Sequence, residues 1–314
     1  MKKYLYLVLS AVLLVSFIGC KSQGDKPVQE SETKEAEEVE IVEEDKEDSE
    51  KEYTRIIAGT VAVSEVLDVL QVDEVVGVPT TAYALPERYQ GLTEIGRPME
   101  PDMEIVKSLD PDLFVSVESV IEANEPKLQQ NNIPYLFISL DSIELIKNSI
   151  ETLGTEIGKA DFAKEITSNM DAKIDEIVKK TEGKESPRVL FLFGSPKAIS
   201  VGTPNSYVGS LLEKLNVNNI SDEIVEGEPK SYMPLNLENI VVADPDLIIR
   251  MTHAAPEKSQ AMLDKEFSEN DIWKNLRAVQ EGKVVDLELD LFSVSGSVNV
   301  VDAIEKLYEH VYER

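Results

Sequence analysis

Two stretches of this sequence share one pattern: Asp102-Met-Glu-Ile-Val-Lys-Ser-Leu-Asp-Pro-Asp112 and Asn236-Leu-Glu-Asn-Ile-Val-Val-Ala-Asp-Pro-Asp246. In each, a glutamate stands eight residues before the aspartate that closes Asp-Pro-Asp, and an apolar run follows. The pattern predicts a helix, a turn stiffened by proline and then a strand. Because it occurs at corresponding positions of two blocks, it predicts two pseudo-symmetric lobes.

Short apolar runs alternate with helical segments on both sides of this pattern. We expect strands at residues 55–57, 75–77, 113–117, 135–138, 189–193, 247–249 and 284–287. We expect helices at residues 61–70, 103–109 and 301–312. Such alternation is typical of parallel βα units. The predicted fold class is therefore α/β, with two Rossmann-like lobes.

The segment between the two blocks is expected to be helical. Residues 143–186 contain no proline, and apolar residues recur at helical spacing from Ile146 to Ile177. We predict a single long helix that passes from one lobe to the other and is ended by Gly183 and Pro187. The expected organisation is an N-terminal lobe at 53–142, a connecting helical region at 143–183 and a C-terminal lobe at 184–314.

The N-terminus predicts export. Lys2 and Lys3 precede an apolar run from Tyr4 to Ile18, which is short for a membrane span but fits a signal peptide. The small Gly19 before the chain's one cysteine, Cys20, resembles a bacterial lipobox. We expect a signal peptide at 1–19 and a lipid on Cys20. The alternative is an uncleaved signal anchor with a free thiol.

An acidic segment follows the cysteine. Residues 21–52 hold fourteen acidic residues and five lysines, with hardly any large apolar residue, which predicts a disordered linker over 20–52. The whole chain has a formal net charge of −29. A charge of this sign argues against nucleic acid as a partner.

Signals of an enzyme are nearly absent from the sequence. It has no Gly-x-Ser-x-Gly elbow, no phosphate-binding glycine loop and no Cys-x-x-Cys pair. His253 and His310 are the only histidines, which argues against a multi-histidine zinc site. His310 lies on the expected last helix and is interpreted as a surface or capping residue. We therefore expect a binding protein rather than an enzyme.

Two residues stand out as candidates for ligand contact. His253 follows the strand at 247–249, and open α/β sheets bind ligands at the carboxyl ends of their strands. The alternative is a loop histidine bonded to the backbone. Met99 lies in a loop stiffened by Pro98 and Pro101, whereas core methionines usually sit on amphipathic elements. Taken alone, Met99 is explained equally well as filler and as a ligand.

Four segments carry a resemblance to a known family: Ile95-Gly-Arg-Pro-Met-Glu-Pro101, Leu85-Pro-Glu-Arg-Tyr89, Ile249-Arg-Met-Thr-His253 and Glu269-Asn-Asp-Ile-Trp-Lys274. They resemble the heme-receptor lipoproteins of the iron-regulated surface determinant (Isd) system. These belong to the two-lobed solute receptors of the siderophore, cobalamin and heme class. The resemblance covers residues 55 to about 312 and implies a heme receptor that serves an ABC importer.

The resemblance also implies how heme is held. Met99 from one lobe and His253 from the other would bind the heme iron axially, a thioether and imidazole pair that leaves no open iron position. The loop at 80–84 lacks the basic residue that the family pattern places near a propionate. The propionates are instead expected at the amides around Thr60 and Val61, helped by hydroxyls of Thr81 or Tyr83.

Partners follow from the same resemblance. Glu104 and Glu238, the glutamates of the repeated pattern, would meet arginines of the importer's permease, which works with its ATPase. The alternative is two ordinary solvated charges. Surface heme-binding proteins upstream are further expected partners. The lipid on Cys20 would anchor the receptor to the outer face of the cell membrane.

Three alternatives remain open. A receptor of the same fold could bind a ferric siderophore or cobalamin. An envelope heme or metal enzyme could use His253. Met251 or Met103, rather than Met99, could supply the sulfur ligand.

Overall fold

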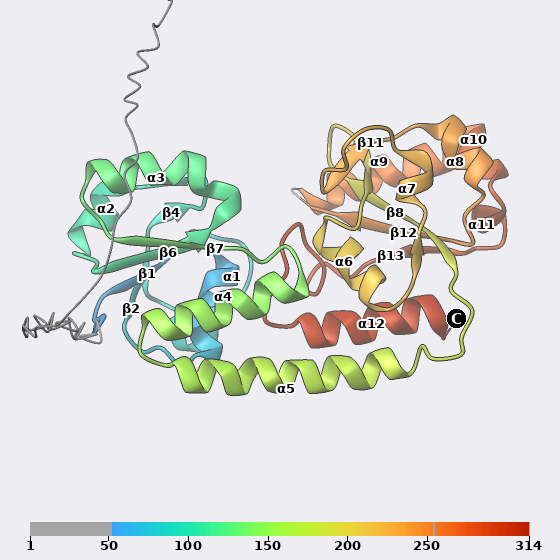
Figure 1. Cartoon of the computed structure of the whole chain (residues 1–314). Coiled ribbons are helices and arrows are strands. Elements are labelled where there is room, and N and C mark those ends of the chain that lie inside the picture. Colours follow the sequence, from blue (N-terminus) through green and yellow to red (C-terminus); the bar gives the residue numbers. More distant parts are fainter. Residues whose placement is uncertain (1–51, 254, 314) are drawn as a thin grey trace, which may run out of the picture. The chain divides into compact units, whose positions relative to one another are not determined.

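The computed structural model describes residues 52–253 and 255–313 (Figure 1). The expected signal peptide, Cys20 and all but the last residue of the expected acidic linker lie outside the described residues. Within the described part, no helix is both long enough and apolar enough to cross a membrane.

The first sheet is parallel throughout, as predicted. Its order is β3-β2-β1-β6-β7. Its strands are β1 (Ile56–Ala58), β2 (Val75–Val78), β3 (Thr93–Glu94), β6 (Leu113–Val117) and β7 (Tyr135–Ile138). Every residue of the interior strand β6 is buried, because helices cover both faces of a parallel sheet.

The remaining elements of the first block are short. They are α1 (Val61–Val69), the 3-10 turns η1 (Glu87–Tyr89) and η2 (Glu118–Val120), the two-stranded hairpin β4 (Gly96–Arg97) and β5 (Glu100–Pro101), α2 (Met103–Ser108) and α3 (Ile121–Gln130). The turn of this hairpin carries Met99, one of the predicted ligand contacts.

The second sheet mixes strand directions. Its order is β11-β9-β8-β12-β13, and β10 pairs with β8. The strands are β8 (Arg188–Gly194), β9 (Ile199–Gly202), β10 (Asn218–Asn219), β11 (Tyr232–Pro234), β12 (Leu247–Thr252) and β13 (Val284–Asp286). The predicted strands β8, β12 and β13 are parallel, whereas β9 pairs antiparallel with both of its neighbours, β8 and β11. Four residues join β8 to β9, and a parallel crossover needs a dozen or more.

Helices flank this second sheet. They are α6 (Tyr207–Lys214), α7 (Ser221–Ile224), α8 (Leu237–Ala243), α9 (Pro256–Glu269), α10 (Asp271–Asn275), α11 (Arg277–Gln280) and α12 (Val300–Tyr312). The last of these agrees closely with the helix predicted at 301–312.

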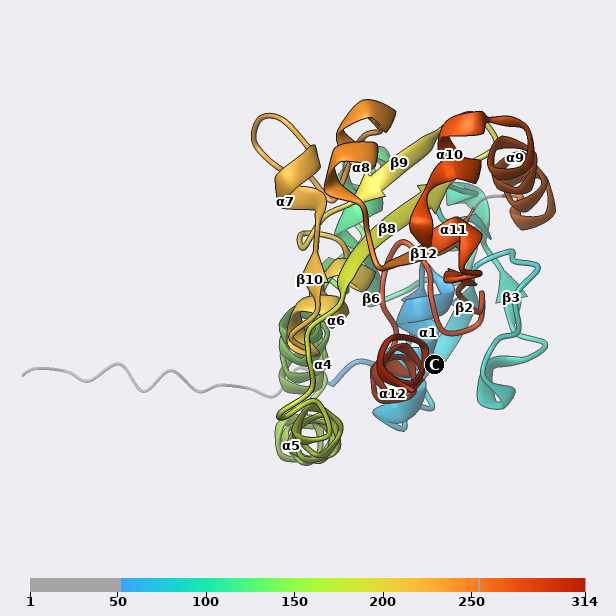
Figure 2. The ribbon, with the colours of Figure 1, turned by 90° about the vertical axis from the view of Figure 1, so that its right-hand side faces the viewer.

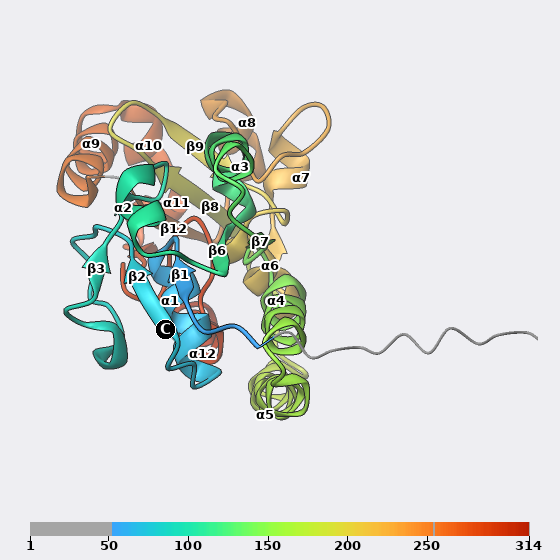
Figure 3. The ribbon, with the colours of Figure 1, turned by 90° about the vertical axis from the view of Figure 1, so that its left-hand side faces the viewer.

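The connection between the two blocks is helical, as predicted. It consists of two helices, whereas a single helix was predicted. Helix α4 (Ile143–Glu156) ends before Gly158, and α5 (Ala160–Lys179) begins after it. Gly158 has φ +72°, a left-handed conformation that reverses the chain and favours glycine. The two helices then lie side by side (Figures 2 and 3). Gly154 permits this, since a Cβ there would collide with Ala163.

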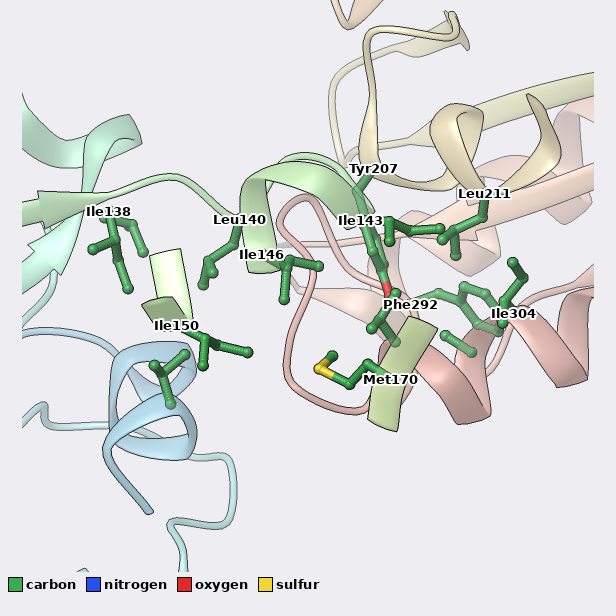
Figure 4. Close-up of a cluster of buried hydrophobic side chains, with 14 of the residues drawn as sticks. Ile138, Leu140, Ile143, Ile146, Ile150, Met170, Tyr207, Leu211, Phe292 and Ile304 are labelled. Atoms are coloured by element: carbon green, nitrogen blue, oxygen red, sulfur yellow. The ribbon is translucent and has the colours of Figure 1, made fainter. Parts of the chain in front are cut away.

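A buried apolar cluster joins elements of both blocks (Figure 4). Ile146 of α4, Met170 of α5 and Tyr207 of α6 belong to it, together with Phe292 from the segment after β13. The Gly296 N–H donates to the Leu140 carbonyl at 2.7 Å, which fixes that segment beside α4. Each large side chain that is fully buried here contributes roughly 1.5–3 kcal/mol. The lobe boundaries at residues 142 and 184 stay predictions.

The repeated sequence pattern is a repeated structure. Asp102 caps α2 and Asn236 caps α8, and each accepts a hydrogen bond from the N–H of the pattern's glutamate at 3.0 Å. Asp110 and Asp244, which open the two Asp-Pro-Asp turns, both have left-handed backbone, with φ 45° and 41°. The predicted helix, turn and strand are confirmed in both copies.

The closing aspartates of the pattern also match. The Arg55 backbone N–H donates to Asp112 at 3.0 Å, and the Arg188 backbone N–H donates to Asp246 at 2.9 Å. These bonds tie the turn of each unit to the central strand next to it, β1 in one sheet and β8 in the other. The strand after each turn is thereby held in register.

Candidate ligand site

The residues after the parallel strands define the candidate site. In the first sheet, Thr60 follows β1, Thr80 and Thr81 follow β2, Glu118 follows β6 and Asp141 follows β7. The carboxyl ends of parallel strands meet at one edge, where open α/β sheets bind ligands. Most of the predicted contacts in the first block therefore share one edge.

Met99 lies at the turn of the β4–β5 hairpin and is 59% exposed. The buried Asn124 side chain donates to the Pro98 carbonyl at 2.8 Å and so ties this turn to α3. A cavity of about 550 Å³ is lined by Met99 and residues 118–123. An exposed thioether on an anchored turn, facing a cavity, is not core filler.

The other two methionines considered as sulfur ligands are placed differently. Met251 is fully buried in β12, inside the apolar core. Met103 is partly buried at the start of α2 and packs against a smaller apolar cluster around Phe114. Of the three, Met99 has the most accessible sulfur-bearing side chain.

His253 comes directly after β12, which lies between β8 and β13 in the parallel part of the second sheet. Its N–H donates to the Gly194 carbonyl at 3.4 Å, and its carbonyl accepts from the Ser259 hydroxyl at 3.3 Å. Both bonds use backbone atoms of His253 and neither uses its imidazole. Burial lowers the pKa of the imidazole below its ordinary value. A neutral imidazole near pH 7 is the form that binds a metal.

The start of α1 offers amides to an anion. The Thr60 hydroxyl accepts from the Val63 N–H at 3.1 Å, and the Thr60 carbonyl accepts from the Ser64 N–H at 3.0 Å. The Thr60 hydroxyl is therefore engaged as a cap. The N–H groups of Val61 and Ala62 precede the first intrahelical bond, so they are the donors that a carboxylate would meet.

The loop after β2 is partly ordered by its own hydrogen bonds. The Thr80 N–H donates to the Gly96 carbonyl at 2.8 Å, and the Tyr83 N–H donates to the Thr81 hydroxyl at 3.0 Å. The Tyr83 side chain is 54% exposed. Thr81 and Tyr83 thus lie near each other on an accessible loop, while their contact with a ligand remains a prediction.

An aromatic pair at the second sheet was missed from the sequence. The Phe193 and Tyr232 rings lie 4.6 Å apart between centroids. The Tyr232 hydroxyl is buried and has no hydrogen-bond partner among the described residues. Burial raises the pKa of this phenol, and the charge of Asp141 raises it further. Asp141 of the first block is therefore close to Tyr232 of the second.

The sequence matches the model of the periplasmic binding protein family over residues 56–291. The chain belongs to this family. This periplasmic binding protein is 35% identical over 260 residues to the high-affinity heme uptake system protein IsdE of Staphylococcus aureus. The match covers 82% of the chain and 87% of IsdE.

Two solved structures resemble this periplasmic binding protein over nearly the same span. S. aureus IsdE complexed with heme has a TM-score of 0.76 at 35% identity, covering 83% of this chain and 100% of that one. An ABC transporter substrate-binding protein from Listeria monocytogenes EGD-e has a TM-score of 0.77 at 31% identity, covering 84% and 100%.

The two glutamates of the repeated pattern are both on the surface. Glu104 and Glu238 are exposed and occupy the second position of α2 and of α8. Glu104 pairs with Lys107 at 2.8 Å, within its own helix. The periplasmic binding protein thus presents one exposed glutamate from each copy of the pattern.

The second histidine has a structural partner. His310 on α12 has its Nε2 atom 3.0 Å from the Glu288 carboxylate, in the segment after β13. Across residues 52–253 and 255–313, no three histidine, cysteine or acidic side chains cluster as a metal site.

Proposed function

We propose that this chain is a cell-surface receptor that captures heme and delivers it to an ABC importer for iron acquisition. One observation carries the proposal. An accessible thioether, Met99, lines a cavity in one block, and an imidazole with a lowered pKa, His253, follows a parallel strand in the other, in a chain 35% identical to a heme uptake protein. The activity is capture and transfer, not catalysis.

In this proposal Met99 and His253 are the axial ligands of the heme iron. Each comes from a different block, so heme would be held by both. The lowered pKa of His253 keeps its nitrogen lone pair available to iron at neutral pH. With both axial positions filled, no site is left for oxygen to bind, which suits transport without reaction.

The heme propionates are assigned to the start of α1. The free amides at Val61 and Ala62, next to the Thr60 cap, sit at the positive end of the helix dipole. Hydroxyls of Thr81 and Tyr83 would add hydrogen bonds from the neighbouring loop. This arrangement provides donors to the carboxylates without an arginine or a lysine.

Delivery uses the exposed glutamates. Glu104 and Glu238 dock the receptor on the permease of the importer, whose ATPase drives uptake. The lipid on Cys20 anchors the receptor to the outer face of the cell membrane, and the acidic linker at 20–52 gives it reach. Surface heme-binding proteins upstream would supply the heme.

Ligation is tested first, by heme titration of the full chain. The expected product is a six-coordinate, low-spin heme, and Met99→Ala and His253→Ala should each change its absorption spectrum. Met103→Ala and His310→Ala serve as matched controls with unchanged spectra. If neither Met99→Ala nor His253→Ala perturbs the spectrum, the axial assignment is wrong. Preferred binding of a ferric siderophore or of cobalamin would contradict heme as the ligand, and sustained turnover of bound heme would indicate an enzyme.

A further inference from the structure

The ligand edge of the first sheet is divided by charge. The strand order β3-β2-β1-β6-β7 fixes the order of the loops along this edge. The loops after β2 and β1 bring Thr81, Thr60 and the amides of α1, whereas the loops after β6 and β7 bring Glu118 and Asp141. Among these residues, the hydroxyl and amide donors lie after β1 and β2, and the two carboxylates lie after β6 and β7.

The charged half borders the cavity of Met99. Glu118 lines that cavity, and both Glu118 and Asp141 are exposed to solvent. Partial desolvation of the Asp141 carboxyl, and then the charge of Glu118, raise the pKa of Asp141. The charge of Glu118 thus acts on Asp141, and Glu118 itself lines the same cavity as the proposed sulfur ligand.

An aromatic surface lies close to the charged half. Tyr232, packed against Phe193, is near enough to feel the charge of Asp141, and its hydroxyl has no partner among the described residues. Heme is chemically unequal around its rim, since both carboxylates are on one side and the opposite side carries apolar vinyl and methyl groups. An aromatic pair suits the apolar side.

We propose that Glu118 and Asp141 set the orientation of heme and exclude strongly anionic ferric chelates. Like charges repel the propionates from the β6–β7 half, while the start of α1 attracts them to the β1–β2 half. The vinyl side then faces Tyr232. This inference rests on the proposed function, because it concerns the direction in which the proposed ligand lies.

The test compares heme with heme dimethyl ester, which lacks the propionate charges, on the full chain. In the Glu118→Gln, Asp141→Asn double variant, affinity for heme relative to the ester should rise roughly threefold to tenfold. The hyperfine-shifted heme methyl resonances should change from one dominant set to two. Binding of a ferric tris-catecholate should become detectable. The Glu165→Gln, Asp175→Asn double variant on the exposed side of α5 makes the same charge change and should leave all three readouts unaltered.

Two results would overturn the inference alone. One is an unchanged affinity ratio and a single set of methyl resonances in the Glu118→Gln, Asp141→Asn variant. The other is an equal change in the α5 variant, which would assign the effect to net charge. Failure of the unaltered chain to bind heme is a different outcome, since it overturns the proposed function and the inference with it.

Discussion

The α2–β6 unit and the α8–β12 unit share a framework but not their chemistry. Both have a capped helix, a left-handed turn residue and an aspartate that accepts from the backbone N–H of an arginine, just before β1 in one unit and at the start of β8 in the other. The proposed iron ligands are not part of that repeat. Met99 comes from a hairpin before α2, and His253 follows β12 directly. In the proposed function, the repeat supports the two edges where the ligand lies, and the unrepeated segments next to it supply the iron ligands.

The largest expected effect concerns the glutamates that the two units do share. Reversing both charges, Glu104→Lys with Glu238→Lys, should abolish heme uptake by cells and leave heme binding by the purified chain intact, because both side chains are exposed. Glu213→Lys, an exposed glutamate on α6, is the control. Loss of heme binding in the double variant would instead indicate a structural role.

A stability effect should be shared by the two closing aspartates. Asp112 accepts from the N–H groups of Thr54 and Arg55 at 2.7 and 3.0 Å, whereas Asp246 accepts from the Arg188 N–H and from the Arg277 guanidinium at 2.8 Å. Replacing either aspartate by alanine should lower the free energy of unfolding by about 2 kcal/mol.

In the second unit, the closing aspartate also accepts a hydrogen bond from an arginine side chain. Arg277→Ala should cost less than about 1 kcal/mol, since this ion pair is partly exposed. Urea unfolding measures all three variants, with the exposed Asp175→Ala as a control within about 0.5 kcal/mol. If Asp112→Ala and Asp246→Ala are both as mild as this control, the repeated bonds do not hold the framework.

The smallest effect concerns pH, because one proposed ligand titrates and the other does not. The pKa of His253 is lowered by burial, so its imidazole stays neutral as pH falls through the ordinary value near 6.5. Heme affinity should therefore be level from pH 8 to about pH 6.5 and fall only below that range. A midpoint above about pH 6.5 would contradict the lowered pKa. In His253→Ala this pH dependence should disappear.

The sequence predicts the parts of the fold whose signal is local. Strands at 113–117 and 135–138 agree with β6 and β7 residue for residue, because interior parallel strands are short, largely apolar runs. The break between α4 and α5 at Gly158 does not show in the apolar spacing, because that spacing continues across it. The left-handed turn at this position nevertheless favours glycine. Strand β11 has three residues, one of them proline, and resembles a loop.

The site was predictable only where a residue type is rare. With two histidines in the chain, His253 stood out by its place after a strand. Glu118 and Asp141 could not stand out among 60 acidic residues. Their proximity follows from the neighbouring positions of β6 and β7 in the sheet. Tyr232 likewise could not be selected from the sequence, because Asp141, whose charge acts on it, is 91 positions away.

The most direct measurement of the central claim is near-infrared magnetic circular dichroism of ferric heme bound to the full chain. A thioether opposite an imidazole gives a characteristic low-spin charge-transfer band. This band should be present in the unaltered chain, lost in Met99→Leu and in His253→Ala, and retained in Met103→Leu. Retention of the band in Met99→Leu would contradict the account, since iron would then take its sulfur ligand from elsewhere.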